Sequence, residues 1–301
     1  MPELSRRSFE ATTHSAISVV NAIPAGKGVT IGIYIPCRVK ATISPKVDSR
    51  EIVVESNAED PHHLVETTAK YALSHLRARI TETSQLRIQV KSKIPTAVGL
   101  KSSSAVSVAA AKAVFGLYGR EEDYRAILKT SCTASKDSKA SLTGAYDDAA
   151  ASLLGGLVFT NNTRFKILKH KRVPRGLGTK VAILVPDKKK LTSSLDAFSY
   201  SKYKDESLNA FRYSMEDEFS SAMMLNSIIQ CAALGYSMNQ VSAALNAGAS
   251  AAGITGKGPA VAEICKDSKT LQRIRKGWLA VSGVCRIIQT SIVQPEVTIR
   301  D

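Results

Sequence analysis

The sequence has few of the features that mark membrane, secreted or metal-binding proteins. No run approaches 18 consecutive apolar residues, so no transmembrane helix is expected. The first 15 residues lack the apolar core of a secretory signal. The five cysteines lie at least 20 residues apart without a Cys-x-x-Cys pair, which indicates neither a zinc site nor a disulfide framework. We therefore expect a cytoplasmic protein with no membrane partner.

Two common nucleotide-binding signatures are also absent. The chain has no GxxxxGK[ST] segment and no GxGxxG segment, so neither a P-loop kinase nor a dinucleotide-binding domain is supported. His62 and His63 are adjacent at a helix start but have no third ligand nearby in sequence. We expect both to be solvated.

What the sequence does contain is a large excess of positive charge. The 301 residues include 41 Lys and Arg and 26 Asp and Glu, which gives a net charge of +15. Such an excess favours anionic partners, whether nucleic acid, phosphorylated metabolites or carboxylates, without choosing among them. Residues 164–190 hold ten Lys or Arg and one acid, a pattern that is most typical of a solvated face.

The order of periodic segments predicts an α+β fold. Strand-like alternation covers 16–23, 29–35, 38–43 and 51–55, and a helical pattern runs from Leu64 to Leu76. Further strands are expected at 86–90, 157–160, 181–185, 260–264 and 285–293, and helices at 102–117, 121–133, 148–154, 205–234, 238–245 and 268–276. Strands that first cluster and then alternate with helices suggest two domains. We divide the chain into 1–165 and 166–301.

The most informative segment is Ile94-Pro-Thr-Ala-Val-Gly-Leu-Lys-Ser-Ser-Ser-Ala105, which follows a strand and precedes a helix of small residues. Free N–H groups at a helix start form an anion site. Gly99 would let a phosphate approach the backbone, and Lys101 adds a cation. The alternative is an ordinary serine cap on a core helix. A second stretch, Gly253-Ile-Thr-Gly-Lys-Gly-Pro259, would wrap a ligand closely or form a tight turn.

These motifs together resemble the GHMP kinase superfamily. PxxxGLxSSxA at 95–105, the late GITGKGP and an aspartate before Gly155-Gly156 occur in the order of that superfamily. The loop version GLKSSSA, with NAIPAGKG at 21–28 and LTGAYDDA at 142–149, is similar to the archaeal-type shikimate kinase branch. The likeness extends from about residue 16 to 264. It implies an N-terminal domain like that of a ribosomal protein and a ferredoxin-like C-terminal domain.

The resemblance implies transfer of the ATP γ-phosphoryl group to the 3-hydroxyl of shikimate, giving 3-phosphoshikimate for aromatic amino-acid biosynthesis. The partners would be these small molecules, with no nucleic acid, and the chain a monomer or homodimer. The resemblance places ATP against Pro95, Ala97, Val98, Gly99, Leu100, Lys101, Ser102, Ser103, Ser104 and Ala105. It places the acceptor against Asn21, Lys27, Asp148, Thr255 and Gly256, and Mg²⁺ against Ser103 and Asp137.

Counting back from Gly155-Gly156, the superfamily's catalytic aspartate corresponds to Asp148, with Lys101 and the neighbouring Asp147 as further catalytic candidates. Phosphoryl transfer needs positioning and charge neutralisation, which backbone amides, Lys101 and Mg²⁺ would supply. Asp148 would accept the hydroxyl proton. An acidic pair at a helix start is the alternative for both aspartates. Lys27 would pair with a carboxylate or phosphate, or be a solvated turn lysine.

Two other functions compete with this interpretation. One is another GHMP small-molecule kinase, such as a homoserine or mevalonate kinase, from which Lys101 and the Asp147-Asp148 pair lead us away. The other is a nucleic-acid-binding protein, suggested by the net charge of +15. The basic stretch lacks interleaved aromatic residues beyond Phe165, which argues against RNA recognition.

Overall fold

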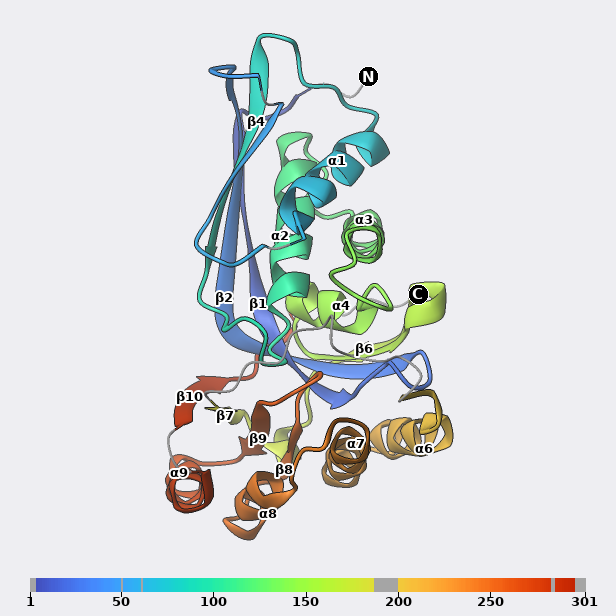
Figure 1. Cartoon of the computed structure of the whole chain (residues 1–301), viewed down its shortest axis with the longest axis vertical. Coiled ribbons are helices and arrows are strands. Elements are labelled where there is room, and N and C mark those ends of the chain that lie inside the picture. Colours follow the sequence, from blue (N-terminus) through green and yellow to red (C-terminus); the bar gives the residue numbers. More distant parts are fainter. Residues whose placement is uncertain (1–3, 50, 61, 187–199, 283–284, 296–301) are drawn as a thin grey trace.

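The computed structural model describes residues 4–49, 51–60, 62–186, 200–282 and 285–295. Two sheets, each with its own helices, lie end to end along the long axis (Figure 1). The first unit comprises β1 (Ser8–Val20), β2 (Lys27–Pro45), β3 (Ile52–Ser56), α1 (Leu64–Leu76), β4 (Ser84–Ser92), α2 (Ser102–Leu117), α3 (Tyr124–Asp137), α4 (Tyr146–Leu154), β5 (Leu157–Asn161) and β6 (Lys166–Lys171). The second comprises β7 (Lys180–Pro186), α6 (Lys204–Met215), α7 (Phe219–Leu234), α8 (Asn239–Asn246), β8 (Ala251–Ile254), β9 (Val261–Cys265), α9 (Ser268–Ser282) and β10 (Cys285–Ser291).

The long strand β2 organises the first sheet. The strand order is β3-β4-β2-β5-β6, with β1 also paired to β2, and only the β3–β4 pairing is parallel among the described strands. β4 pairs with the far end of β2, at Cys37–Pro45, and β5 with its near end, at Lys27–Ile31. The two ranges predicted as separate strands at 29–35 and 38–43 are therefore one continuous strand, because the alternation is unbroken through Pro36.

The basic stretch contains the edge strand β6, which the charge pattern obscured. Ile167 and His170 are buried in this strand, while Lys166 and Leu168 are exposed. Lysine on an exposed edge discourages pairing with another chain. β6 pairs with β5 in the first sheet, so this strand, which follows residue 165, still belongs to that sheet. The domain division at 165/166 stays a prediction, and residues 187–190 of the basic stretch lie outside the described residues.

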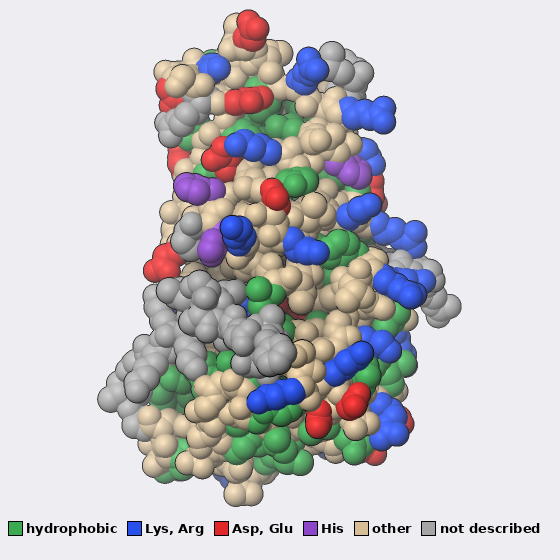
Figure 2. Space-filling model, turned by 45° about the vertical axis from the view of Figure 1, so that its right-hand side comes forward, with side chains coloured by type: hydrophobic (Ala, Val, Ile, Leu, Met, Phe, Trp, Pro, Cys, Tyr) green, Lys and Arg blue, Asp and Glu red, His purple; other side chains and the backbone are tan. Residues whose placement is uncertain are grey.

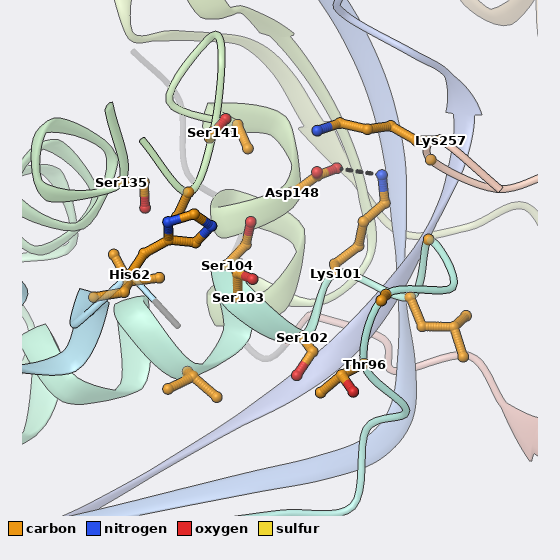
Figure 3. Close-up of a pocket in the computed structure, with 18 of the residues that line it drawn as sticks. His62, Thr96, Lys101, Ser102, Ser103, Ser104, Ser135, Ser141, Asp148 and Lys257 are labelled. Atoms are coloured by element: carbon orange, nitrogen blue, oxygen red, sulfur yellow. Dashed lines mark ion pairs between the residues drawn. The ribbon is translucent and has the colours of Figure 1, made fainter. Parts of the chain in front are cut away.

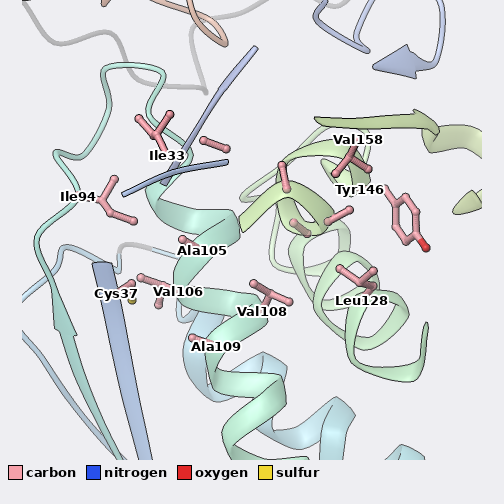
Figure 4. Packing of buried hydrophobic residues seen from close by; sticks show 14 of the residues in the cluster. Ile33, Cys37, Ile94, Ala105, Val106, Val108, Ala109, Leu128, Tyr146 and Val158 are labelled. Atoms are coloured by element: carbon pink, nitrogen blue, oxygen red, sulfur yellow. The ribbon is translucent and has the colours of Figure 1, made fainter. Parts of the chain in front are cut away.

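Small side chains bury α2 between the sheet and the other helices (Figure 4). Ala105, Val108 and Ala109 have no exposed surface, and they face the first sheet and α4 (Figure 4). Gly116 fits under the ring of Phe9, where a Cβ would collide. The buried helix predicted at 102–117 is confirmed, and burial of so many alanines and valines stabilises it.

The second sheet has the strand order β10-β7-β9-β8 with every pairing antiparallel. With helices inserted after β7 and after β9, this is the ferredoxin-like arrangement. Trp278 of α9 is fully buried, as a packing residue would be, and its Nε1 donates to the carbonyl of Gln240 at 2.8 Å. The helical region predicted at 205–234 is broken into α6 and α7, because Asp217 adopts φ 64 between them.

Backbone hydrogen bonds fasten the second unit to the first. Ile292 forms a bridge with Ile33, and the Val293 N–H donates to the Gly32 carbonyl at 2.9 Å. The Val293 carbonyl accepts from Gly156 at 2.6 Å. These contacts fix how the ends of the two sheets meet, and the candidate site lies at that junction.

On the face shown in Figure 2, the positive charge is spread out rather than gathered into a stripe. On the face in Figure 2, Lys and Arg side chains alternate with acidic side chains and neutral surface. Several are paired, for example Arg6 with Glu121 at 2.6 Å and Lys70 with Glu66 at 2.6 Å. No helix in the described ranges is long and apolar enough to cross a bilayer.

Candidate active site

A cavity of about 340 Å³ opens where the two units meet. Its walls come from the loop before α2, the first residues of α2 and α4, and the turn between β8 and β9. The lining is completed by residues 21–23, 56, 58–60, 62, 64, 135, 140–143 and 145. A helix start that opens into a cavity presents unpaired N–H groups to any ligand held there. The cavity is therefore suited to an anionic ligand.

The loop before α2 is held in an unusual backbone conformation. Ala97 has φ 59, Gly99 φ 89 and Lys101, the cap of α2, φ 62. A left-handed conformation is costly for residues with a side chain. Glycine adopts this left-handed conformation without strain. Gly99 also lies close to the β8–β9 turn, where a Cβ would collide with the carbonyl of Thr255. The loop thus needs glycine at the point where it packs against the β8–β9 turn.

Of the residues predicted to contact ATP, eight line the cavity and two lie beneath it. Those in the lining are Pro95, Ala97, Gly99, Leu100, Lys101, Ser102, Ser103 and Ser104. Val98 and Ala105 are buried below the surface, 3% and 0% exposed. Val98 still positions the loop, because its carbonyl accepts from the Ala260 N–H at 3.2 Å.

Lys101 and Asp148 meet inside the cavity. The Lys101 Nζ lies 2.9 Å from Oδ1 of Asp148, and their side chains are 7% and 15% exposed. Figure 3 shows the pair facing each other across the space above Ser103 and Ser104. Lys101 also donates to the Ser18 hydroxyl at 2.8 Å. Two residues 47 positions apart in sequence are thereby combined into one charged centre at the start of α2.

Asp147 is buried behind Asp148 instead of being solvated at the helix start. It is 3% exposed, and its carboxylate accepts from the Asn162 amide at 2.7 Å and the Thr30 hydroxyl at 3.3 Å. Burial, assisted by the charge of Asp148, raises the pKa of Asp147 to about 6, against the opposing effect of Lys101. Both aspartates line the cavity, but Asp148 pairs with Lys101 whereas Asp147 is held by Asn162 and Thr30.

The β8–β9 turn forms the opposite wall. The glycine-rich stretch 253–259, predicted to lie between a helix and a strand, begins inside the short strand β8, and its residues 255–259 belong to the hairpin turn between β8 and β9. Thr255 is fully buried, where its hydroxyl donates to the Gly99 carbonyl at 3.2 Å. The Asn21 amide donates to the Gly256 carbonyl at 2.9 Å. Asn21 and Gly256 line the cavity, whereas Thr255 holds the two loops together.

Lys27 and Asp137 are not brought into the cavity lining. The Lys27 ammonium lies over the ring of Phe211, 5.4 Å from its centroid. The charge of Asp137 raises the pKa of the Tyr71 hydroxyl, so this carboxylate faces α1. The two residues predicted to hold Mg²⁺, Ser103 and Asp137, thus do not converge around the cavity.

The lining still suits a magnesium ion held chiefly by phosphates. Mg²⁺ in kinases commonly takes one or two protein oxygens together with phosphate and water. Ser103 and Asp148 provide a hydroxyl and a carboxylate on the same cavity. Among the described residues no group of three or more His, Cys, Asp or Glu side chains is arranged to hold a metal alone. The donor set fits an ion that arrives with its nucleotide.

Several residues in the lining were not found from the sequence. Lys257 is the main one. Its burial and the nearby charge of Lys101 lower the pKa of Lys257 to about 8. Its position between two glycines of a turn was the available signal. His62, expected to be solvated, is exposed yet lies in the lining. Ser135 and Ser141 also line the cavity and lie outside the motifs named above. Thr143 lies in the LTGAYDDA segment, of which only the two aspartates were predicted as site residues.

Comparison with known proteins gives a consistent result. The model of the GHMP kinases N terminal domain matches residues 63–156. A shikimate kinase of Pyrococcus abyssi is 33% identical over 272 residues, covering 90% of this chain and 95% of the relative. Shikimate kinases of Thermococcus kodakarensis and Methanocella arvoryzae are 32% and 31% identical, over 87% and 94% of this chain and 94% and 93% of theirs.

Solved structures agree on the fold. A homoserine kinase from Cytophaga hutchinsonii has a TM-score of 0.74 at 16% identity, covering 99% of both chains. The Methanococcus jannaschii mevalonate kinase has a TM-score of 0.72 at 18% identity, covering 97% of this chain and 100% of that one. At such identities the likeness shows the two-unit α+β architecture and not the acceptor.

Proposed function

This chain belongs to the archaeal-type shikimate kinase family of GHMP kinases, and we propose that it transfers the γ-phosphoryl group of ATP to the 3-hydroxyl of shikimate. That it is a small-molecule kinase follows from the family. The acceptor is our proposal, supported by relatives named shikimate kinase that align over most of the chain. The product would be 3-phosphoshikimate, a precursor of aromatic amino acids.

One structural observation carries the proposed chemistry: the Lys101–Asp148 ion pair lies inside a cavity into which α2 opens with its N-terminus. Unpaired N–H groups at residues 102–104 would bind the ATP phosphates. Ser103 and Asp148 would hold Mg²⁺, which would neutralise phosphate charge when bound. Lys101 would hold Asp148 in place and offset charge on the transferring group.

The transfer step uses Asp148 as the proton acceptor. The shikimate hydroxyl oxygen attacks the γ-phosphorus, and a new oxygen–phosphorus bond forms. The bond from the γ-phosphorus to the bridging oxygen breaks, and its electron pair leaves with ADP. The hydroxyl proton passes to the Asp148 carboxylate. The Lys101 ammonium, 2.9 Å from this carboxylate, holds it inside the cavity.

The acceptor has a carboxylate and several hydroxyl groups, and the cavity offers matching partners. Ser135 of α3 presents a hydroxyl, as do Ser141 and Thr143 from the segment between α3 and α4. Asn21 and Gly256 line the side nearest the second unit. Lys27 would contribute only if its side chain left the Phe211 ring.

We also place the reaction in the cytoplasm, since all five cysteines are free.

The test is ADP release measured with shikimate, homoserine and mevalonate in parallel. We expect Mg²⁺-dependent release with shikimate and little with the other two. Equal turnover of homoserine, or none of shikimate, would contradict the acceptor while leaving the kinase family intact. Tight, salt-sensitive RNA binding with no kinase activity would instead favour a nucleic-acid role, because phosphate contacts weaken steeply as salt rises.

A further inference from the structure

We propose that Lys257 is a second cation for the transferring phosphoryl group, its ammonium binding a non-bridging oxygen of the ATP γ-phosphate. The inference rests on the proposed function, because it assigns a residue to the same transfer step. The Lys257 side chain extends from the β8–β9 turn into the cavity, toward Asp148 (Figure 3).

The backbone around Lys257 is held in one position. Its carbonyl accepts from the Tyr236 hydroxyl at 2.9 Å, and the Gly258 N–H donates to the Thr255 carbonyl at 2.9 Å. The preceding Gly256 is fixed by Asn21, at 2.9 Å, and by its own N–H to the Ser18 hydroxyl at 3.3 Å. A side chain on such a turn is aimed before any ligand arrives, which reduces the entropy lost on binding.

The charges around Lys257 leave room for an anion. Asp148 is already paired with Lys101, at 2.9 Å. Within the part of the chain that the structure describes, no carboxylate oxygen lies within 4.0 Å of the Lys257 ammonium. Burial and the like charge of Lys101 lower the pKa of Lys257 to about 8, while Asp148 partly opposes them. An anionic oxygen between the two ammonium groups would relieve both effects.

The position of Asp148 favours the phosphoryl group over the acceptor carboxylate. Asp148 receives the proton of the attacking hydroxyl, so the phosphorus must lie next to the oxygen beside Asp148. Lys101 and Lys257 both reach toward that carboxylate, from the loop before α2 and from the β8–β9 turn (Figure 3). Cations on two sides of a transferring phosphoryl group stabilise the charge that spreads over its oxygens.

Nucleotide binding tests the assignment without any acceptor. We would titrate a non-hydrolysable ATP analogue and ADP, each with Mg²⁺, into the wild type and Lys257→Met, Lys257→Arg and Lys266→Met. Lys266 is exposed after β9 and controls for the loss of one charge. Lys257→Met should weaken the analogue about 10-fold relative to ADP, the loss of one charge-assisted contact. Lys257→Arg should retain most of the preference, and Lys266→Met should match the wild type.

Kinetics and pH separate a phosphate contact from a structural role. Lys257→Met should lower kcat about 10²–10³-fold, as for loss of one preorganised donor. Only the ammonium form binds, so the preference of the wild type for the analogue should fall above about pH 8. Lys257→Met should lose this pH dependence, and Lys257→Arg should move it upward, with Lys101, Asp147 and Asp148 unchanged in every variant.

Several results would overturn the assignment. Unchanged analogue and ADP affinities in Lys257→Met, with weaker shikimate binding, would assign Lys257 to the acceptor carboxylate. No change in any affinity would make it a solvated turn lysine. If Lys257→Met melts well below the wild type, Lys257→Arg and Lys257→Gln carry the same comparison. A failure of shikimate turnover in the wild type would refute the acceptor and leave the nucleotide result standing.

Discussion

Asp148→Asn keeps the size of the side chain and removes its charge, so it isolates the carboxylate. In the wild type this carboxylate lies 2.9 Å from the Lys101 ammonium, with exposures of 15% and 7%. Breaking a fully buried pair costs about 3–5 kcal/mol and an exposed pair about 0–1 kcal/mol. The pair borders an open cavity and Lys101 keeps its bond to Ser18 at 2.8 Å, so we expect a loss of about 1–3 kcal/mol.

The effect on catalysis should be far larger than the effect on folding. Without a carboxylate to receive the hydroxyl proton, kcat should fall roughly 10²–10⁴-fold, the usual range for a general base. Without Mg²⁺, ADP binding should be unchanged or slightly tighter, because a negative charge beside the phosphate site has been removed. A large loss of kcat at intact affinity for metal-free ADP is thus the expected signature.

The assay is ADP release at saturating ATP and shikimate, with thermal melts on the same samples. The melts distinguish a catalytic loss from unfolding. A well-folded Asp148→Asn protein with near-normal turnover would refute the role of this residue. If Asp147→Asn were inactive instead, the register counted from Gly155-Gly156 would be wrong by one residue.

Three further predictions concern the surroundings of the site and the second sheet. Asp147→Asn should lower kcat less than Asp148→Asn. Because burial raises the pKa of Asp147 to about 6, the stability of the Asp147→Asn variant relative to wild type should improve from pH 4 to 7 in thermal melts. Gly99→Ala should lower kcat/KM for ATP about 10²-fold, since its Cβ would strike Thr255, whereas Gly176→Ala meets nothing within 4 Å and should be neutral. Glu263 is fully buried, and burial raises its pKa to about 7. Because the unfolded chain ionises this carboxyl from about pH 4.5, the stability of the wild type should fall as pH rises toward 7. Glu263→Gln lacks this loss and should therefore gain more stability over wild type at pH 8 than at pH 5.

The part of the cavity formed by the loop before α2 was predictable because it is local in sequence. The strand, the loop and α2 are consecutive, and the segment 94–105 contains glycine, lysine and serines in that order. A helix start that follows such a loop has unpaired N–H groups wherever the rest of the chain goes. The helix at 102–117 was predicted from the alanine and valine residues that follow this loop.

The pairings across the cavity were not predictable from periodicity. That Lys101 meets Asp148 depends on how α4 packs beside α2. Lys257 reaches toward them because Thr255 and Gly256 hold the β8–β9 turn against the first unit. The resemblance to a family indicated Asp148 but gave no reason to look at Lys257. Long-range packing, which sequence spacing does not encode, decided which charged residues share a cavity.

Asp137 illustrates the limit of counting residues. Eleven positions separate it from Asp148, but α3 ends at Asp137 and the intervening loop carries residues 140–143 into the cavity. The spacing along the chain therefore did not translate into spacing in the fold. Lys27 differs in the same way, since its ammonium lies over the Phe211 ring contributed by α6.

The central claim is transfer of a phosphoryl group from ATP to one hydroxyl of shikimate in the cavity between the two units. The most direct measurement is phosphorus and proton NMR of the product formed from ATP and shikimate with Mg²⁺. We predict one new phosphate ester, coupled to the proton at carbon 3, in amounts equal to the ADP released and absent with Asp148→Asn. ADP release without an ester, or an ester on another hydroxyl, would contradict the account.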